Sequence, residues 1–508
     1  MSDVKVATDT LIVRATVLTT VLTVLGAVLG LLRDLLLARF FGATADTDAF
    51  LVAWTVPETA SPLLIEGAMA FLMVPIFVQA MANGTGLAAV VRSTLPRIAG
   101  ALAIASAAIA LGAPLVVRLL APGLADPELA IRCTRITAIT VLSFGVAGYL
   151  GAGLRSMHRF GWAASIYVAY NVGILSAMTL LHGRLGAMSA AIGVAVGSLL
   201  MVAVQLPSFV RRLEPGRRLV SRPHVALGAF IPIAAFALTR HAQIFVERVL
   251  GSELSAGTIS HLNYAQKVAQ VPMTLAVLVA TVTFPLLARS VVTGDEGSSR
   301  SRMDWDLRLV IGVVLAASAY IIAFAEPIIE VLFQHGAFTA TDSATTASIM
   351  RVYAIGLPAQ AAIVVVSRSY FSERRPVWYP ALTMAAGLAA TLVVAMMLLD
   401  VWQGVGIAAA NAVGISLAAA LLLVGQRTNL AAVSLRAVGR SVAGLALLAA
   451  IAGLVGFGVG QAMRGAPPLV VAGIGLVVVS TAFLLLCVLT GREETRWLVQ
   501  RLRREHAG

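Results

Sequence analysis

Charged side chains interrupt a few long apolar stretches of this sequence, and these residues are the ones whose types could do chemistry. Arg33 and Asp34 lie in one apolar stretch, Glu66 lies in the next, and Lys267 lies in the second half of the chain. Burying an ionised side chain in hydrocarbon is costly unless it faces water or a partner, so we expect these residues to line a hydrated cavity. Arg and Lys in such a cavity attract anionic groups such as phosphates and carboxylates.

Polar residues near these charges extend the candidate site. Asn263, Lys267 and Gln270 share one helical face because they are spaced i, i+4 and i+7. Pro57 and Pro62 interrupt the second apolar stretch, and such breaks are tolerated in a membrane where the segment lines a cavity. The predicted substrate-binding residues are Arg33, Asp48, Glu66, Arg240, Asn263, Lys267 and Gln270.

Purely structural roles are alternatives for the same residues. Arg33 and Asp34 could pair with each other at a helix-packing seam. Glu66 could neutralise Arg33 or Lys267 without contacting a substrate. Asp48 stands at the start of the second apolar stretch, where it could cap a helix. The sequence leaves both interpretations open.

Motifs for catalysis and for cofactors are absent from the sequence. No set of His, Cys, Asp and Glu residues has metal-ligand spacing, and there is no nucleophile elbow, Walker motif or Gly-rich phosphate loop. Cys133 and Cys487 give neither a disulfide framework nor a zinc quartet. We therefore expect a transporter and not an enzyme, with no cofactor, driven by an ion gradient, the membrane potential or substrate supply.

The composition of the chain shows which elements must position these residues. Of the 508 residues, 59% are hydrophobic and 12% are charged, whereas a soluble domain carries about 25% charged residues. These values exclude a cytosolic enzyme and a disordered chain, and the repeated long apolar runs predict an all-α polytopic membrane protein. The predicted fourteen spans cover residues 10–41, 48–82, 90–121, 131–154, 160–182, 185–210, 224–249, 258–288, 306–332, 345–371, 377–399, 403–426, 438–462 and 467–490.

Basic residues are concentrated in alternate loops, and this alternation predicts the orientation. The positive-inside rule assigns the more basic side to the cytoplasm, so we expect both termini there. The net charge of +13 then reflects membrane topology and not nucleic-acid binding. The predicted cytoplasmic loops after the second, fourth and sixth spans contain Arg92, Arg97, Arg155, Arg159, Arg211, Arg212, Arg217, Arg218 and Arg222. The opposite loops contain Arg39, Arg118, Arg132, Arg135, Arg184, Arg248 and Arg464.

The two halves of the chain are related in sequence. Arg39-Phe-Phe-Gly42 matches Arg248-Val-Leu-Gly251, and Leu154-Arg155-Ser156 matches Ser367-Arg368-Ser369 at a nearly constant offset. Six predicted spans separate the matched points, so the repeat is parallel, and paired bundles of this kind enclose a cavity and rock against each other. The predicted domains are a six-helix lobe at 1–213, a second at 214–430, an added helix pair at 431–491 and a basic cytoplasmic tail at 492–508.

Several motifs occur in order between residues 20 and 430, and together they resemble one known family. They are Gly30-Leu-Leu-Arg-Asp34, Ala38-Arg-Phe-Phe-Gly42, Thr47-Asp-Ala-Phe50, Glu66-Gly-Ala68, Ala121-Pro-Gly-Leu-Ala-Asp126, Asp304-Trp-Asp-Leu-Arg308 and Phe333-Gln-His-Gly-Ala-Phe-Thr339. With them the chain resembles the MurJ/MviN family of lipid II flippases, in the multidrug/oligosaccharidyl-lipid/polysaccharide exporter superfamily. The resemblance implies fourteen helices in two six-helix lobes plus an appended pair.

The resemblance also implies a function and partners. The family moves a polyprenyl-diphosphate-linked peptidoglycan precursor, lipid II, from the inner to the outer leaflet of the bacterial cytoplasmic membrane by alternating access. The implied partners are this lipid-linked glycan precursor, membrane lipids, a coupling ion and cell-wall synthesis proteins, and nucleic acid is not among them. Arg33, Asp48 and Glu66 match residues that the family uses.

The chain departs from the family at positions that bear on the substrate. Family arginines fall on Ala27, Ser61 and Pro62, and a further one is Lys267, which lacks the bidentate fork of arginine. Arg240 is the candidate that compensates for the lost charge. The alternatives are therefore a flippase for another polyprenyl-linked glycan, or an ion-coupled small-molecule antiporter of the drug-extrusion type that uses Glu66 and Asp48. A membrane glycosyltransferase would need an acidic outer-loop motif that is not visible, and a non-transporting scaffold is a further alternative.

Overall fold

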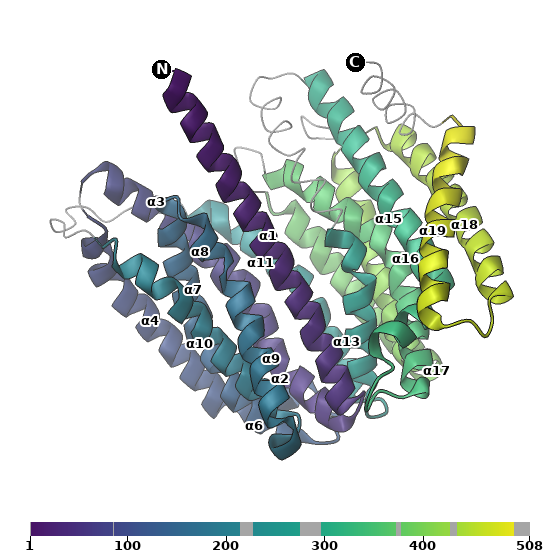
Figure 1. The fold of residues 1–508 in the computed structure, drawn as a ribbon, viewed down its shortest axis with the longest axis horizontal. Coiled ribbons are helices and arrows are strands. Elements are labelled where there is room, and N and C mark those ends of the chain that lie inside the picture. The colour runs from purple at the N-terminus through teal and green to yellow at the C-terminus, as the bar shows by residue number, and fades with distance from the viewer. Residues whose placement is uncertain are drawn as a thin grey trace. The chain divides into compact units, whose positions relative to one another are not determined.

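A computed structural model of the chain describes residues 2–84, 86–213, 227–274, 296–371, 377–426 and 434–491, which are helices joined by short turns with no strand among them (Figure 1). The predicted all-α polytopic class is confirmed. The fold divides into two compact units. Unit 1 comprises Met1–Ser260 with Gly336–Phe338, and unit 2 comprises His261–His335 with Thr339–Gly508.

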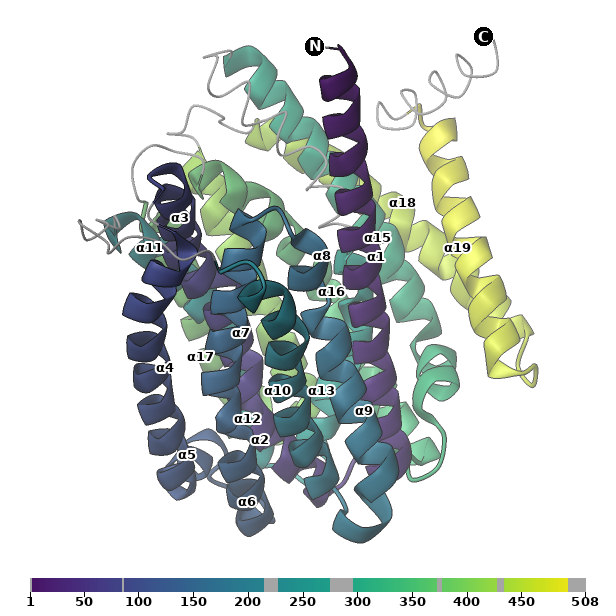
Figure 2. The same cartoon turned by 60° about the vertical axis from the view of Figure 1, so that its left-hand side comes forward.

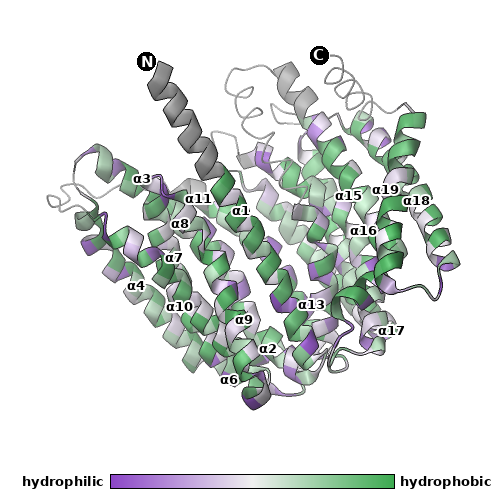
Figure 3. Cartoon of the chain, viewed as in Figure 1, coloured by the Kyte–Doolittle hydropathy of each residue, from purple (hydrophilic) through white to green (hydrophobic). Residues whose placement is uncertain are grey.

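Eleven helical segments in the described part of the chain are long and apolar enough to cross a membrane, and Figure 3 shows their hydrophobic colouring. Ten of them coincide with one predicted span each, and the longest covers two. The predicted span 224–249 corresponds to two shorter helices, and the predicted span 258–288 runs beyond the described residues after 274. The candidate spans are Val17–Phe41, Ala45–Ala82, Leu87–Leu111, Pro127–Ser156, Phe160–Leu185, Met188–Val210, Met303–Phe333, Ala340–Tyr370, Tyr379–Gly425, Leu435–Ala462 and Pro468–Leu489.

The longest segment, α17 (Tyr379–Gly425), is a helical hairpin. A straight helix of its 47 residues would be about 70 Å long, more than twice the roughly 30 Å of a bilayer core. Gln403 breaks it with φ 47° and ψ −129°. The two arms then run back along each other, because a Cβ on Gly387 would lie 2.6 Å from the carbonyl oxygen of Gly414. Small residues permit this close approach, so two predicted spans fold as one antiparallel pair.

Unit 1 is a bundle around α7, which packs against α3, α4 and α10 (Figures 1 and 2). The helix of the second candidate span changes at Pro62, which has no N–H to donate, and the chain continues there as the π-helix η1, whereas Pro57 lies inside α2. The elements of unit 1 are α1 (Ser2–Phe41), α2 (Ala45–Ser61), η1 (Pro62–Ala68), α3 (Met69–Ala82), α4 (Leu87–Leu111), α5 (Ala113–Leu120), α6 (Pro127–Thr137), α7 (Ile139–Ser156), α8 (Phe160–Ala164), α9 (Ile166–Leu185), α10 (Met188–Val210), α11 (Leu227–His241) and α12 (Gln243–Ser252).

Unit 2 is built on α15, against which α16, α18 and α19 pack. Phe324 has non-helical angles just before Pro327, so α15 bends there, and the Phe324 ring is 1% exposed. This ring contacts Gly456, Gly460 and Gly475, whose missing side chains make room for it. Besides α17, the unit contains α15 (Glu296–Phe333), α16 (Ala340–Phe371), α18 (Leu435–Ala462) and α19 (Pro468–Leu489), and α13 (Thr258–Ala269) begins in unit 1 and continues in unit 2.

The predicted domain boundaries stay predictions. Residues 214–226 and 427–433, where the lobes were expected to end, lie outside the described residues, as does the predicted basic tail at 492–508. The same holds for several arginines of the predicted cytoplasmic set, namely Arg217, Arg218 and Arg222.

Candidate functional site

Arg33 lies in α1 and is held from two sides. Its Nε and Nη2 donate hydrogen bonds to Oδ1 of Asp34, at 2.9 and 2.8 Å. Its guanidinium carbon lies 4.4 Å from the centroid of the Trp54 ring, which is cation–π geometry. Trp54 in turn stacks on Tyr170 with ring centroids 6.1 Å apart. Residues of α2 and α9 thus form an aromatic wall that fixes a cation whose side chain is 14% exposed.

A second ion pair lies further along α2. Glu58 follows Trp54 by one helical turn, so both side chains leave the same face of α2. Its Oε2 lies 3.9 Å from Nη2 of Arg248 in α12, whose side chain is only 2% exposed. The charge count placed Arg248 in an outer loop, and neither residue was among the predicted site. Glu58 carried the same signal as Glu66, a carboxylate inside an apolar stretch, and could have been found from it.

Asp48 is a helix cap for a distant segment. Its Oδ2 accepts the backbone N–H of Gly257 at 2.7 Å, and its Oδ1 accepts the N–H of Ser260 at 2.7 Å and the hydroxyl of Ser260 at 2.6 Å. The carboxylate is buried, with 3% of the residue exposed. The cap of its own helix is Thr44, which accepts the N–H of Thr47. Asp48 therefore fixes the first turn of α13, the helix that carries Asn263 and Lys267.

Glu66 lies on the π-helix η1 and is solvent-accessible in unit 1. The Tyr167 hydroxyl of α9 donates a hydrogen bond of 2.6 Å to its Oε1. Single π-helical turns are frequent at functional sites, and here the widened turn brings Glu66 to a phenol. In the structure Arg33 pairs with Asp34 and not with Glu66.

The predicted residues of unit 2 follow one another along α13. Asn263 is buried, whereas Lys267 and Gln270 are half-buried, and Gln270 follows the last helical residue, Ala269. Near the start of α13, two residues before Asn263, Nδ1 of His261 lies 2.9 Å from Oγ1 of Thr346 in α16. The polar face of α13 therefore begins at a side-chain contact with α16.

The same histidine also reaches the first turn of α16. Its Nε2 lies 3.4 Å from Oδ1 of Asp342. The other oxygen of Asp342 accepts the N–H and hydroxyl of Thr339 at 2.8 and 2.7 Å, which is a capping box. His261 therefore belongs to a structural hydrogen-bond cluster that joins α13 to α16.

Arg240 is the penultimate residue of α11 and is exposed in unit 1. In the described part of the chain no hydrogen bond or ion pair joins it to Arg33 or Glu66. The predicted residues of unit 1 thus occupy separate positions: Arg33 against Trp54, Glu66 against Tyr167, and Asp48 at the start of α13. That they line one cavity together with the residues of unit 2 stays a prediction. No group of three or more His, Cys, Asp or Glu side chains suited to a metal ion occurs within the described ranges.

The fold defines a class, a multi-pass helical membrane protein. It is similar to an inward-facing multidrug resistance MATE family transporter of the MOP superfamily, with a TM-score of 0.67 at 12% identity over 84% of this chain and 99% of the other. It is also similar to a lipid II flippase MurJ in an inward closed conformation, with a TM-score of 0.75 at 21% identity over 94% of this chain and all of the other.

Sequence comparison narrows the class to one family. The profile described as "Lipid II flippase MurJ" matches residues 37–472. The lipid II flippase MurJ of Burkholderia cenocepacia is 28% identical over 68% of this chain and 70% of its own length. The probable lipid II flippase MurJ of Vibrio cholerae is 25% identical over 77% of this chain and 78% of its own length. The chain belongs to the MurJ family and is a multi-pass bacterial membrane protein.

Proposed function

We propose that this protein is a flippase that carries the polyprenyl-diphosphate-linked peptidoglycan precursor, lipid II, from the inner to the outer leaflet of the cytoplasmic membrane. The observation that carries the proposal is the family match over residues 37–472, together with named lipid II flippases among the relatives. Transport proceeds by alternating access, with both chain termini in the cytoplasm. The precursor is the substrate, and membrane lipids surround the protein. A coupling ion and cell-wall synthesis proteins are further partners.

The chemistry of Arg33 supports an anionic headgroup. A diphosphate presents several negatively charged oxygens, and hydrogen bonds between charged groups are about twice as strong as neutral ones. Nε and Nη2 of Arg33 are engaged by Asp34, so Nη1 faces away from that partner. The aromatic wall of Trp54 holds the guanidinium plane in place. A phosphate oxygen that reaches Nη1 thus meets an oriented donor that loses little conformational entropy on binding.

Lys267 and Asn263 supply a second set of donors on α13. A lysine ammonium is a compact point charge with rotatable donors, so it suits a phosphate or a carboxylate without demanding one orientation. Asp48 supports this set indirectly, because it caps the helix that carries both residues. Asp48 is therefore proposed as a positioning residue, and Arg33 and Lys267 as groups that touch the headgroup.

A related glycan lipid is the rival substrate. Ser61 and Pro62 replace family arginines, and in this chain they belong to the turn that leads to Glu66 and Tyr167. The cavity therefore has less fixed positive charge near η1, where Glu66 keeps a hydrogen-bonded phenol. This difference favours a headgroup that offers hydroxyl or amide groups at this position as well as phosphate.

Complementation tests the proposal and separates the rivals. A strain depleted of its own lipid II flippase would express the wild-type chain, Arg33→Ala, Lys267→Ala or Glu66→Ala, with Arg132→Ala as a control, because Arg132 is exposed in a surface pair with Glu128. We expect growth and outer-leaflet lipid II with the wild type and the control, and loss of both with Arg33→Ala. Normal protein levels without any rescue by the wild type would reject lipid II as the substrate.

A further inference from the structure

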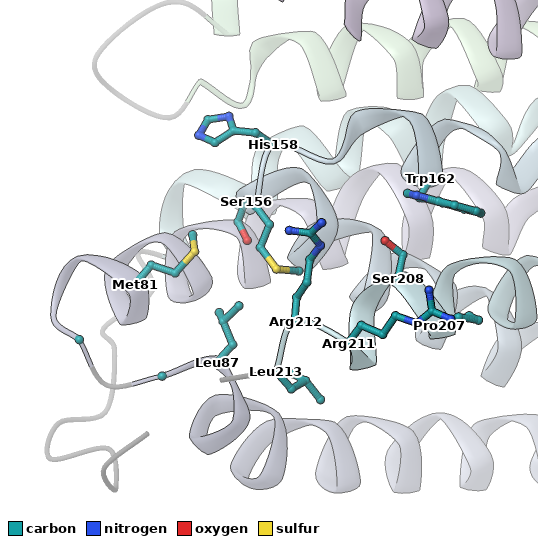
Figure 4. Close-up of a pocket in the computed structure, with 13 residues that line it drawn as sticks. Met81, Leu87, Ser156, His158, Trp162, Pro207, Ser208, Arg211, Arg212 and Leu213 are labelled. Atoms are coloured by element: carbon teal, nitrogen blue, oxygen red, sulfur yellow. The ribbon is translucent and has the colours of Figure 1, made fainter. Parts of the chain in front are cut away.

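Unit 1 contains a pocket of about 1330 Å³ at one end of its helix bundle (Figure 4). Three connections meet there: the one between α3 and α4, the one between α7 and α8, and the end of α10. Five candidate membrane spans therefore begin or end at this pocket. The pocket therefore lies at the level where these spans end, which for a membrane protein is a bilayer surface.

The described segments that border the pocket carry arginines. The segments 82–97, 155–162 and 207–213 contain six arginines and no Asp or Glu. Two of these arginines, Arg211 and Arg212, line the pocket, and both are exposed. Neither forms an ion pair with any residue that the structure describes. In Figure 4, Arg212 extends toward the middle of the pocket. Among the lining residues that the structure describes there is no Asp or Glu to offset the attraction for an anion.

Hydroxyl and aromatic groups complete the lining. Ser156 and Ser208 lie on either side of Arg212, and His158 lies at the upper edge of the pocket in Figure 4. Trp162 stands at another edge with 48% of its surface exposed. Tryptophan is enriched at the level of the lipid headgroups, where its ring meets the acyl chains and its N–H meets water. Arginine donors, the Ser208 hydroxyl and an interfacial tryptophan are groups that recognise a phosphodiester at a bilayer surface, whereas the Ser156 hydroxyl donates to the carbonyl oxygen of Gly153 at 2.7 Å.

We propose that this pocket binds the phosphate headgroup of an anionic glycerophospholipid from the leaflet that the basic loops face. Basic pockets between transmembrane helices on the cytoplasmic side bind such headgroups. The volume exceeds what one free phosphate ion fills, and the apolar side chains of Met81, Leu87 and Leu213 in the lining suit the glycerol backbone and the first methylenes of the acyl chains. The bound lipid joins three connections of unit 1 and stabilises that unit, and this role does not depend on which glycan lipid is transported.

The test compares two charge-matched double variants of the full-length protein. Arg211→Gln with Arg212→Gln removes the lining charges, whereas Arg92→Gln with Arg97→Gln removes two exposed arginines of the same basic region that do not line the pocket. Each protein is placed in phosphatidylcholine vesicles with or without phosphatidylglycerol, and the midpoint of thermal unfolding is measured. We expect phosphatidylglycerol to raise the midpoint of the wild type and of the Arg92/Arg97 variant, and not that of the Arg211/Arg212 variant.

A second measurement is the amount of phosphatidylglycerol that stays bound through detergent purification, which native mass spectrometry reports. The Arg211/Arg212 variant should retain about 25-fold less lipid than the wild type, since each of the two basic residues contributes a factor of about five. No rise of the wild-type midpoint, or an equal loss in both double variants, would overturn the proposal. An equal rise with inorganic phosphate in plain phosphatidylcholine vesicles would show a free-anion site and reject the lipid.

Discussion

The carboxylate of Asp48 receives both the backbone N–H and the hydroxyl of Ser260, at 2.7 and 2.6 Å. This links the first turn of α2 to the first turn of α13, although the two residues are 212 positions apart in the chain. A charged residue that the sequence offered as a binding group is thus engaged by the protein itself. Its influence on transport is expected to pass through α13.

Replacing Asp48 by alanine should destabilise the protein by about 3 kcal/mol, because buried donors of α13 lose their acceptor. Asp48→Asn keeps one oxygen acceptor, so its loss of unfolding free energy should be less than half that of Asp48→Ala. Thermal unfolding in detergent measures the difference, with Asp46→Ala as the control, since Asp46 is exposed in the same helical turn. If Asp48→Ala unfolded like the control yet abolished transport, the residue would contact the substrate and not merely position α13.

The buried pair of Glu58 and Arg248 predicts strong coupling. Arg248→Met should cost about 3–5 kcal/mol, because it removes one cation that faces the mostly buried Glu58 carboxylate. Adding Glu58→Gln removes that charge and should restore most of the stability. Arg132→Ala breaks an exposed pair and should cost less than about 1 kcal/mol. A double-mutant cycle on the free energy of unfolding would report additive effects if Glu58 and Arg248 did not interact.

Arg33→Lys keeps the positive charge and loses the planar fork. The lysine can neither stack as well on Trp54 nor donate two parallel hydrogen bonds to Asp34. We expect transport to fall about tenfold at an unchanged amount of folded protein, which matches the loss of one charged hydrogen bond. The initial transport rate and the protein level are measured together, and a lysine variant with full activity would show that only the charge matters.

The close contact between the two arms of α17 predicts that replacing a glycine there by alanine lowers the unfolding midpoint. The same replacement in α18 should not lower it. A Cβ on Gly414 would lie 2.4 Å from the carbonyl oxygen of Gly387, whereas a Cβ on Gly439 meets nothing within 4 Å. Gly414→Ala should therefore separate the arms and lower the unfolding midpoint. Gly439→Ala should leave the midpoint unchanged or raise it, because alanine favours an exposed helix by about 1 kcal/mol over glycine. Equal midpoints for both variants would contradict the antiparallel contact.

The helical class and most spans follow from composition and from the length of the apolar runs, because a bilayer demands about 20 apolar residues per crossing. The break of α17 at Gln403 falls on the first residue of the predicted span 403–426. The pairing of Arg33 with Asp34 was one of two interpretations that local spacing left open. Neighbouring residues on one helix can be judged from sequence in this way.

Partners that are distant in the chain could not be found from the sequence. Asp48 meets Gly257 and Ser260, and Glu58 meets Arg248, only because α2, α12 and the start of α13 pack together. The π-helical turn at Glu66 escaped prediction for another reason: two prolines signal a break but not its geometry. Tertiary packing determines both the distant contacts and the geometry of the π-helical turn, and the periodicity of the sequence carries no information about tertiary packing.

The most direct test of the account measures lipid II movement by the purified protein. Vesicles are loaded with fluorescent lipid II, and an added membrane-impermeant quencher reports how fast the precursor exchanges between leaflets. We predict that the wild-type protein and the Arg132→Ala variant support lipid II exchange at the same rate. The Arg33→Ala variant should support none. Exchange at the same rate in protein-free vesicles, or an unchanged rate in Arg33→Ala, would contradict the claim that this cation guides a diphosphate headgroup across the membrane.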